Sequence, residues 1–268
     1  MDTEKPIGIF DSGIGGLTVA RAVKDLLPNE NIIYFGDTAH LPYGDKSTAA
    51  IQSYTVKICD LLIKQNCKVI LIACNSASSA AYQLAKEYVG SKAKVINVID
   101  PVVSYLGEKF ENKTIGLIGT KRTIKSNVYQ KKLDRTDKNI NLKSLATPLL
   151  APMIEEGYYE NLISDQIIHN YLMDPEIQDI EALVLGCTHY PLIKHQIENF
   201  YQGKTEVIDS SYIVATHLEK YLRKNNLLKD TNLSTNKFFV SDFTRSFAES
   251  TRLFFKEIVN LQHYPLWE

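Results

Sequence analysis

Short apolar runs alternate with amphipathic stretches along nearly the whole 268-residue chain, and this alternation limits the possible folds more than any other feature. The runs are rich in Ile and Val, as in residues 69–72, which is typical of strands buried on both faces. The stretches between them repeat apolar residues every three or four positions, as in residues 17–27, which predicts helices. We therefore expect an α/β fold of mostly parallel sheets with helices on both faces.

The predicted strands are residues 7–10, 31–35, 69–73, 95–99, 114–118, 140–145, 182–185, 205–208 and 238–240. The predicted helices are residues 17–27, 47–65, 77–88, 124–133, 162–172, 191–200, 213–223 and 247–259.

Two parts of the chain share one layout, an apolar strand followed by a small residue, a cysteine and polar residues that begin a helix. These parts are residues 69–76 and 182–189. Residues 7–12 and residues 115–120 also resemble each other, although neither segment contains a cysteine. The repeat predicts two pseudo-symmetric α/β domains, residues 1–100 with 209–268 and residues 101–208, with the active site in the cleft between them.

Cys74 and Cys187 occupy equivalent places at the ends of predicted strands, where ligands bind in folds of this class. A helix N-terminus beside such a thiol favours the thiolate. One cysteine at a strand end is more often a packing residue, but two at equivalent places, the second followed by His189, favour chemistry. Cys59 and Cys67 lie in or beside apolar patterns, and we assign both to packing.

A glycine-rich turn, residues 11–16, follows the first predicted strand. It is not a GxGxxG motif, so a dinucleotide site is only weakly indicated. Its backbone N–H groups suit a carboxylate or phosphate, but a tight turn with Asp11 as a helix cap explains it equally well. The sequence Pro42-Tyr43-Gly44 is ordinary turn chemistry by itself.

Charge and composition argue against several classes of protein. The net charge is −1 without a long basic block, so we expect neither a nucleic-acid groove nor a polybasic membrane surface. No apolar stretch reaches the roughly 20 residues of a membrane span, and no secretory signal begins the sequence, so we expect a cytoplasmic protein. No CxxC or zinc-like Cys/His spacing occurs, so we expect free thiols and no metal.

Four motifs stand out along the chain, residues 8–19 (GIFDSGIGGLTV), 34–44 (YFGDTAHLPYG), 73–77 (ACNSA) and 185–191 (LGCTHYP). Together they closely resemble the glutamate racemases of the aspartate/glutamate racemase superfamily. Ser76 stands where the family pattern has threonine, and serine keeps the hydroxyl group.

The resemblance implies cofactor-independent racemisation of glutamate, with Cys74 acting on the D-enantiomer and Cys187 on the L-enantiomer. Asp11 would assist Cys74, and His189 with Glu155 would assist Cys187, although a glutamate on a helix is commonly just exposed. The implied substrate-binding residues are Asp11, Ser12, Pro42, Tyr43, Gly44, Cys74, Asn75, Ser76, Thr120, Thr123, Cys187, Thr188 and His189. The resemblance further implies D-glutamate supply for peptidoglycan, and a homodimer.

The chemistry of racemisation agrees with a pair of thiols, because one group must take the Cα proton from one face and another must return a proton to the opposite face. Three alternatives remain open. One is an aspartate or hydantoin racemase, and another is a cysteine hydrolase using Cys187, His189 and Glu155, which leaves Cys74 without a purpose. The third is a non-catalytic amino-acid-binding protein, which needs no paired thiols.

Overall fold

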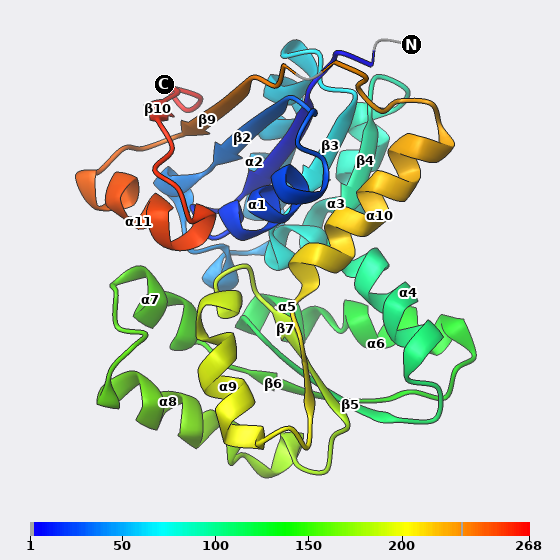
Figure 1. Ribbon diagram of the computed structural model, residues 1–268, viewed down its shortest axis with the longest axis vertical. Helices are drawn as coiled ribbons and strands as arrows, with labels where there is room; N and C mark the ends of the chain where they lie inside the picture. The colour runs from blue at the N-terminus through cyan, green and yellow to red at the C-terminus, as the bar shows by residue number, and fades with distance from the viewer. Residues whose placement is uncertain (1–2, 232) are drawn as a thin grey trace.

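The computed structural model describes residues 3–231 and 233–268, and within them the strands form two parallel sheets (Figure 1). The six-stranded sheet has the order β10-β9-β2-β1-β3-β4, and the four-stranded sheet has the order β6-β5-β7-β8. The strands are β1 (Ile7–Asp11), β2 (Ile32–Gly36), β3 (Val69–Ile72), β4 (Lys94–Asn97), β5 (Thr114–Gly119), β6 (Asn141–Ala146), β7 (Ala182–Gly186), β8 (Glu206–Ile208), β9 (Asn236–Val240) and β10 (Leu261–His263).

Helices cover both faces of the six-stranded sheet. Ile9 of β1 belongs to one buried core with Leu17 and Leu218, whereas the next residue, Phe10, belongs to a second core with Ile58. The helices are α1 (Leu17–Leu26), α2 (Thr48–Lys64), α3 (Asn75–Val89), α4 (Ile99–Lys109), α5 (Lys121–Ser126), α6 (Val128–Leu133), α7 (Leu150–Glu155), α8 (Leu162–Leu172), α9 (Lys194–Tyr201), α10 (Ser210–Lys224) and α11 (Arg245–Phe255). The predicted α/β class with mostly parallel sheets is confirmed.

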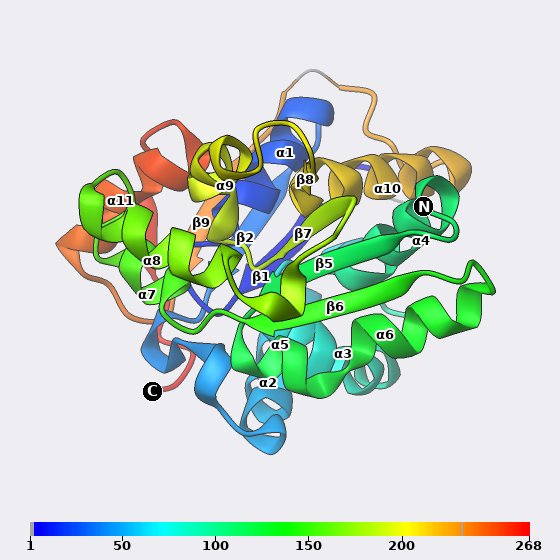
Figure 2. The same ribbon diagram turned by 90° about the horizontal axis from the view of Figure 1, so that it is seen from below.

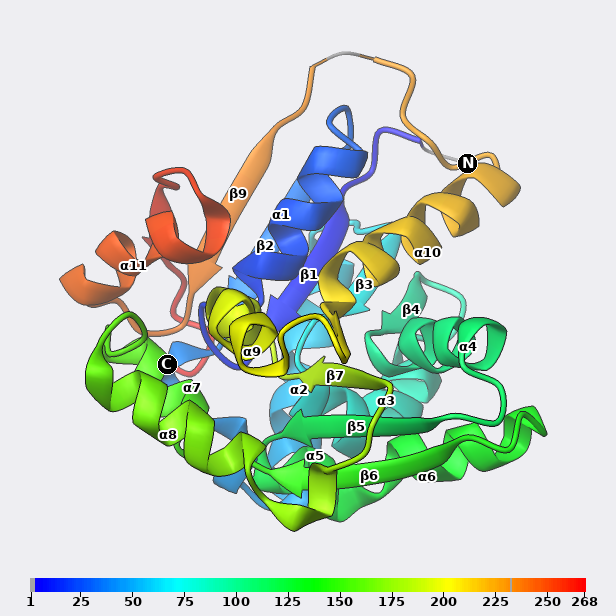
Figure 3. The same cartoon turned by 60° about the horizontal axis from the view of Figure 1, so that its bottom comes forward.

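The chain leaves the six-stranded sheet after β4 and returns to it after β8. The four-stranded sheet lies below the six-stranded sheet in Figure 1, and its strands come forward when the molecule is seen from below (Figure 2). After the four-stranded (second) sheet, α10 packs against α1, and β9 joins the six-stranded (first) sheet beside β2 (Figure 3). The division into residues 1–100 with 209–268 and residues 101–208 stays a prediction, and its first boundary falls within α4 (Ile99–Lys109).

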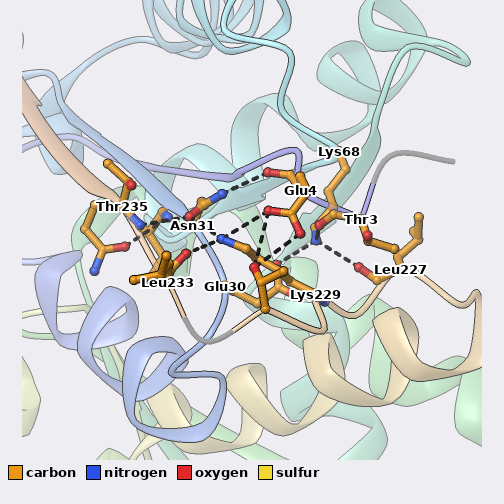
Figure 4. A network of polar contacts seen from close by, with 12 residues as sticks. Thr3, Glu4, Glu30, Asn31, Lys68, Leu227, Lys229, Leu233 and Thr235 are labelled. Carbon is orange, nitrogen blue, oxygen red and sulfur yellow. Dashed lines mark hydrogen bonds and ion pairs between the residues drawn. The ribbon is translucent and has the colours of Figure 1, made fainter.

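A buried polar network attaches the segment after α10 to the six-stranded sheet, near the strand ends opposite to the one that Cys74 follows (Figure 4). Lys68 Nζ lies 2.6 Å from Glu30 Oε2 and donates a hydrogen bond to the Leu227 carbonyl at 2.8 Å. The backbone N–H of Lys229 donates to Glu30 Oε1, and Lys229 Nζ donates to Asn31 Oδ1. Because buried charges are costly unless they are paired, these contacts hold the segment after α10 in one place.

Some element bounds differ from the sequence predictions. The predicted strand 95–99 ends at Asn97, because Asn97 Oδ1 accepts hydrogen bonds from the N–H groups of Ile99 and Asp100 and begins α4 there. The predicted helix 124–133 is interrupted at Asn127, whose φ of 55° is left-handed. The sequence predictions did not include α4, α7 or β10. Among the described residues, no helix combines the length and apolar character needed to cross a bilayer.

Candidate active site

A cavity of about 360 Å³, including its opening to solvent, lies where the carboxyl ends of strands from both sheets meet. Its walls include residues that directly follow β1, β3, β5 and β7. The lining residues are Ser12, Pro42, Tyr43, Gly44, Cys74, Asn75, Ser76, Thr120, Ala151, Glu155, Gly186, Cys187, Thr188 and His189. Without the space open to solvent, the free volume is only about 30 Å³, so the walls of the cavity lie close together.

The cavity brings together all the sequence-predicted site residues except Asp11 and Thr123. Asp11 is fully buried, and Thr123 lies behind Thr120, with 3.1 Å between the two hydroxyl oxygens. Two lining residues were not predicted. Gly186 and Ala151 carry no polar side chain, so the sequence held no chemical signal for them.

Cys74 lies at the N-terminus of α3, where it caps the helix. The Ala77 N–H donates to Cys74 Sγ at 3.5 Å, and Sγ lies 3.7 Å from Ser12 Oγ. Burial of the side chain, together with the nearby Asp11 carboxylate, raises the pKa of the Cys74 thiol. The surroundings of Cys74 therefore favour the protonated thiol at neutral pH.

Asp11 lies behind Cys74 at the end of β1 rather than in the wall of the cavity. Its Oδ2 atom accepts a hydrogen bond of 2.8 Å from the Gly16 N–H, and its Oδ1 atom has no hydrogen-bond partner among the described residues. Burial raises the pKa of Asp11, although its hydrogen bonds and the charge of His189 oppose this shift. Asp11 thus lies beside Cys74, and its hydrogen bond from the Gly16 N–H fixes the tight glycine-rich turn before α1, whose N-cap residue is Gly16.

On the other side, Cys187, His189 and Glu155 form a chain of contacts. Cys187 Sγ lies 3.6 Å from His189 Nδ1. His189 Nε2 lies 2.8 Å from Glu155 Oε1, which is within ion-pair distance. The two groups are not aligned as in a regular hydrogen bond. Burial alone would lower the pKa of His189, but its contacts with Cys187 and Glu155 outweigh burial and raise that pKa well above 6.5. These contacts favour the protonated imidazole, whose Nδ1 atom faces Cys187 Sγ.

The glycine turn of the first sheet packs directly against the Cys187 side of the site. A Cβ atom added to Gly15 would lie 2.4 Å from His189 Cε1 and 2.7 Å from Thr188 Oγ1. Thr18 Oγ1 also donates a hydrogen bond of 3.0 Å to the Thr188 carbonyl. The ring of Phe254 in α11 contacts the His189 ring edge-on, with the ring centres 5.3 Å apart. Residues that flank the six-stranded sheet thus hold the imidazole of His189 beside Cys187.

The polar groups of the cavity suit a carboxylate ligand. Asn75 is nearly fully buried, and its Oδ1 atom accepts a hydrogen bond from Tyr129, which leaves Nδ2 without a hydrogen-bond partner among the described residues. Ser76 Oγ and Thr120 Oγ1 lie 2.8 Å apart and connect residues that follow strands of the two sheets.

No group of three or more His, Cys, Asp or Glu in the described part of the chain is arranged to hold a metal ion.

Comparisons with known proteins agree on one family. Residues 17–218 match the sequence model of the family described as Asp/Glu/Hydantoin racemase. A glutamate racemase of Chlorobium phaeobacteroides is 40% identical over 94% of this chain and 92% of its own length. The crystal structure of glutamate racemase from Francisella tularensis in complex with D-glutamate has a TM-score of 0.92 at 37% identity and covers 99% of both chains. The RacE1 isoform from Bacillus anthracis has a TM-score of 0.93 at 31% identity and covers 98% of both chains.

Proposed function

The chain belongs to the Asp/Glu/hydantoin racemase family, and we propose that it interconverts L-glutamate and D-glutamate without a cofactor, by means of two thiols. One observation carries the proposal. Cys74 and Cys187 each follow a strand of a different sheet, and both line the same small cavity. Two thiols that approach Cα from opposite faces can exchange a proton across that atom, which a single base cannot do.

The surroundings of the thiols differ in a way that suits the conversion of the L-enantiomer. In this step Cys187, as the thiolate beside protonated His189, takes the Cα proton, and the electron pair of the broken C–H bond stays on the substrate. Cys74, as the thiol, gives its proton to the opposite face, where that electron pair forms the new C–H bond. Cys187 is then a thiol and Cys74 a thiolate, which is the arrangement that D-glutamate requires.

The developing negative charge needs donors that are already in place. We infer that Asn75 Nδ2 and the hydroxyls of Ser76 and Thr188 bind the substrate carboxylates. The N-terminus of α3 adds its partial positive charge beside Cys74. Tyr43 and Gly44 line the same cavity. In this scheme Asp11 supports Cys74, and Glu155 supports Cys187 through His189.

Glu155→Gln is expected to move the alkaline limb of the pH profile to lower pH. The Glu155 carboxylate helps to raise the pKa of His189, so its removal lowers that pKa. Protonated His189, which supports the Cys187 thiolate, is then lost earlier as the pH rises. We expect the alkaline limb of kcat/KM for L-glutamate to move down by about one pH unit. Glu156→Gln, at the exposed neighbouring carboxylate, serves as the control. An unchanged limb in Glu155→Gln would remove Glu155 from the mechanism.

Polarimetry tests the activity and the substrate class together. The protein, freed of pyridoxal phosphate, is expected to reduce the optical rotation of L-glutamate to zero and to act far more slowly on L-aspartate. A faster reaction with aspartate or a hydantoin would assign the chain to another branch of the family. A constant rotation with every substrate would instead support a hydrolase, detectable as a trapped acyl-enzyme, or a binding protein.

The cellular setting follows from the same proposal. A glutamate racemase supplies D-glutamate for peptidoglycan, and we propose this role in the cytoplasm for the present chain. We also propose a homodimer, which sedimentation analysis of the purified protein would test.

A further inference from the structure

A buried carboxylate outside the cavity, Asp37, joins the substrate loop to the last residues of the sequence. Asp37 is fully buried. Its Oδ2 atom accepts a hydrogen bond of 2.6 Å from the Tyr43 hydroxyl and lies 3.0 Å from His40 Nδ1. Its Oδ1 atom accepts hydrogen bonds from Trp267 Nε1 at 2.7 Å and from Ser241 Oγ at 2.8 Å. Segments far apart in the sequence therefore meet at one carboxylate.

We propose that Trp267, acting through Asp37, holds Tyr43 and its loop against the cavity and thereby sets the affinity for substrate. Tyr43 is the connection, because it lines the cavity while its hydroxyl binds Asp37. Asp37 and Trp267 do not line the cavity. They are positioning residues, and their loss should affect binding more than the proton transfers at the two thiols.

The second sheet holds the other side of this loop. Arg122 of α5 donates to the Lys46 carbonyl through Nε at 3.1 Å and through Nη2 at 2.5 Å. A Cβ atom added to Gly44 would lie 3.0 Å from Thr120 Cβ, so the loop packs closely against the residue that follows β5. The wall of the cavity is therefore fixed between Arg122 and Asp37, and releasing the Asp37 side frees the loop to move away from the substrate.

The surroundings of Trp267 allow the hydrogen bond to be separated from ring packing. Its ring contacts His40 edge-on with centres 4.5 Å apart, and it contacts Tyr54 at 5.4 Å. Lys57 Nζ lies 4.7 Å from the ring centre. Trp267→Phe keeps an aromatic ring but removes the N–H group, whereas Lys57→Ala removes a contact with the ring and keeps the N–H group. Trp267 is also the single tryptophan of the sequence, so tryptophan fluorescence reports on the surroundings of this one residue.

The first test compares the kinetics of these variants and rests on the proposed racemase activity. Trp267→Phe should raise KM for both enantiomers by about five- to tenfold, because a charge-assisted hydrogen bond is lost, while kcat changes by less than about twofold. Ser241→Ala should raise KM in the same direction, which keeps the test valid if Trp267→Phe folds poorly. Lys57→Ala should match the wild type. An unchanged KM in folded Trp267→Phe and Ser241→Ala would overturn the inference.

The second test uses the fluorescence of Trp267 in the unaltered protein. Titration with D-glutamate should change the emission with a midpoint near KM, and Tyr43→Phe should largely remove the change. An active wild type whose emission does not respond to saturating D-glutamate would contradict the connection through Asp37. A wild type without racemase activity would reject the proposed function, whereas normal activity with unaltered KM in the variants rejects only the role of Trp267.

Discussion

Cys187→Ala and Cys74→Ala are each expected to reduce racemisation in both directions by about a thousandfold or more. In the proposed mechanism every turnover uses one thiol to remove a proton and the other to supply one, so the loss of either blocks both directions. The remaining thiol can still act on its own face. Cys74→Ala should therefore exchange the Cα hydrogen of L-glutamate with solvent while it forms almost no D-glutamate.

Cys59→Ala is the matched control for both substitutions. Cys59 is fully buried in the core between the first sheet and α2, and burial raises its pKa to about 12. Its thiol is therefore unreactive at neutral pH, and we expect near-normal rates with a modest loss of stability. Rates should be followed by chiral chromatography of both enantiomers. A Cys187→Ala enzyme with the wild-type rate would defeat the assignment of the two thiols.

Gly15→Ala is expected to lower kcat by about a hundredfold while leaving the fold intact. The added methyl group would lie 2.4 Å from His189 Cε1, closer than nonbonded atoms approach, so the imidazole must move. Displacing His189 lengthens its contacts with Cys187 and Glu155 and weakens the support of the thiolate.

Gly13→Ala tests whether the effect of Gly15→Ala is specific. Gly13 lies in the same turn as Gly15, and a methyl group added there meets only Leu41, at the ordinary contact distance of 3.5 Å. We expect kcat within about threefold of the wild type. Circular dichroism and thermal unfolding of both variants would establish that they fold. Equal losses of kcat in Gly13→Ala and Gly15→Ala would show that a change in the turn as a whole, rather than the contact with His189, lowers kcat.

Local patterns in the sequence were enough to predict the architecture and the two thiols. Apolar strand runs and helical periodicity depend on residues close together in the chain, and Cys74 and Cys187 stand at visible strand ends. The missed features have other causes. Asn97 ends its strand because its side-chain Oδ1 atom accepts hydrogen bonds from the N–H groups of Ile99 and Asp100, and Asn127 interrupts a helix through a left-handed backbone conformation. Neither residue alters the apolar periodicity on which the predictions rested.

The supporting groups of the site depend on contacts between distant parts of the chain, which a single sequence does not display. The placement of Asp11 behind Cys74 follows from the register of β1 against β3. The contact of Gly15 with His189 joins the two sheets, and the hydrogen bond from Trp267 to Asp37 spans most of the chain. Motif resemblance indicated most residues that line the cavity, but the contacts of Gly15 and Trp267 emerge only from the three-dimensional structure.

Racemisation in deuterium oxide tests the two-thiol mechanism most directly. The enzyme, freed of pyridoxal phosphate, should convert L-glutamate to D-glutamate in which almost every new molecule carries solvent deuterium at Cα. Mass spectrometry of the product separated at low conversion measures this label. D-glutamate that retains the original Cα hydrogen would show that one base carries the proton between the faces, and it would contradict the account given for Cys74 and Cys187.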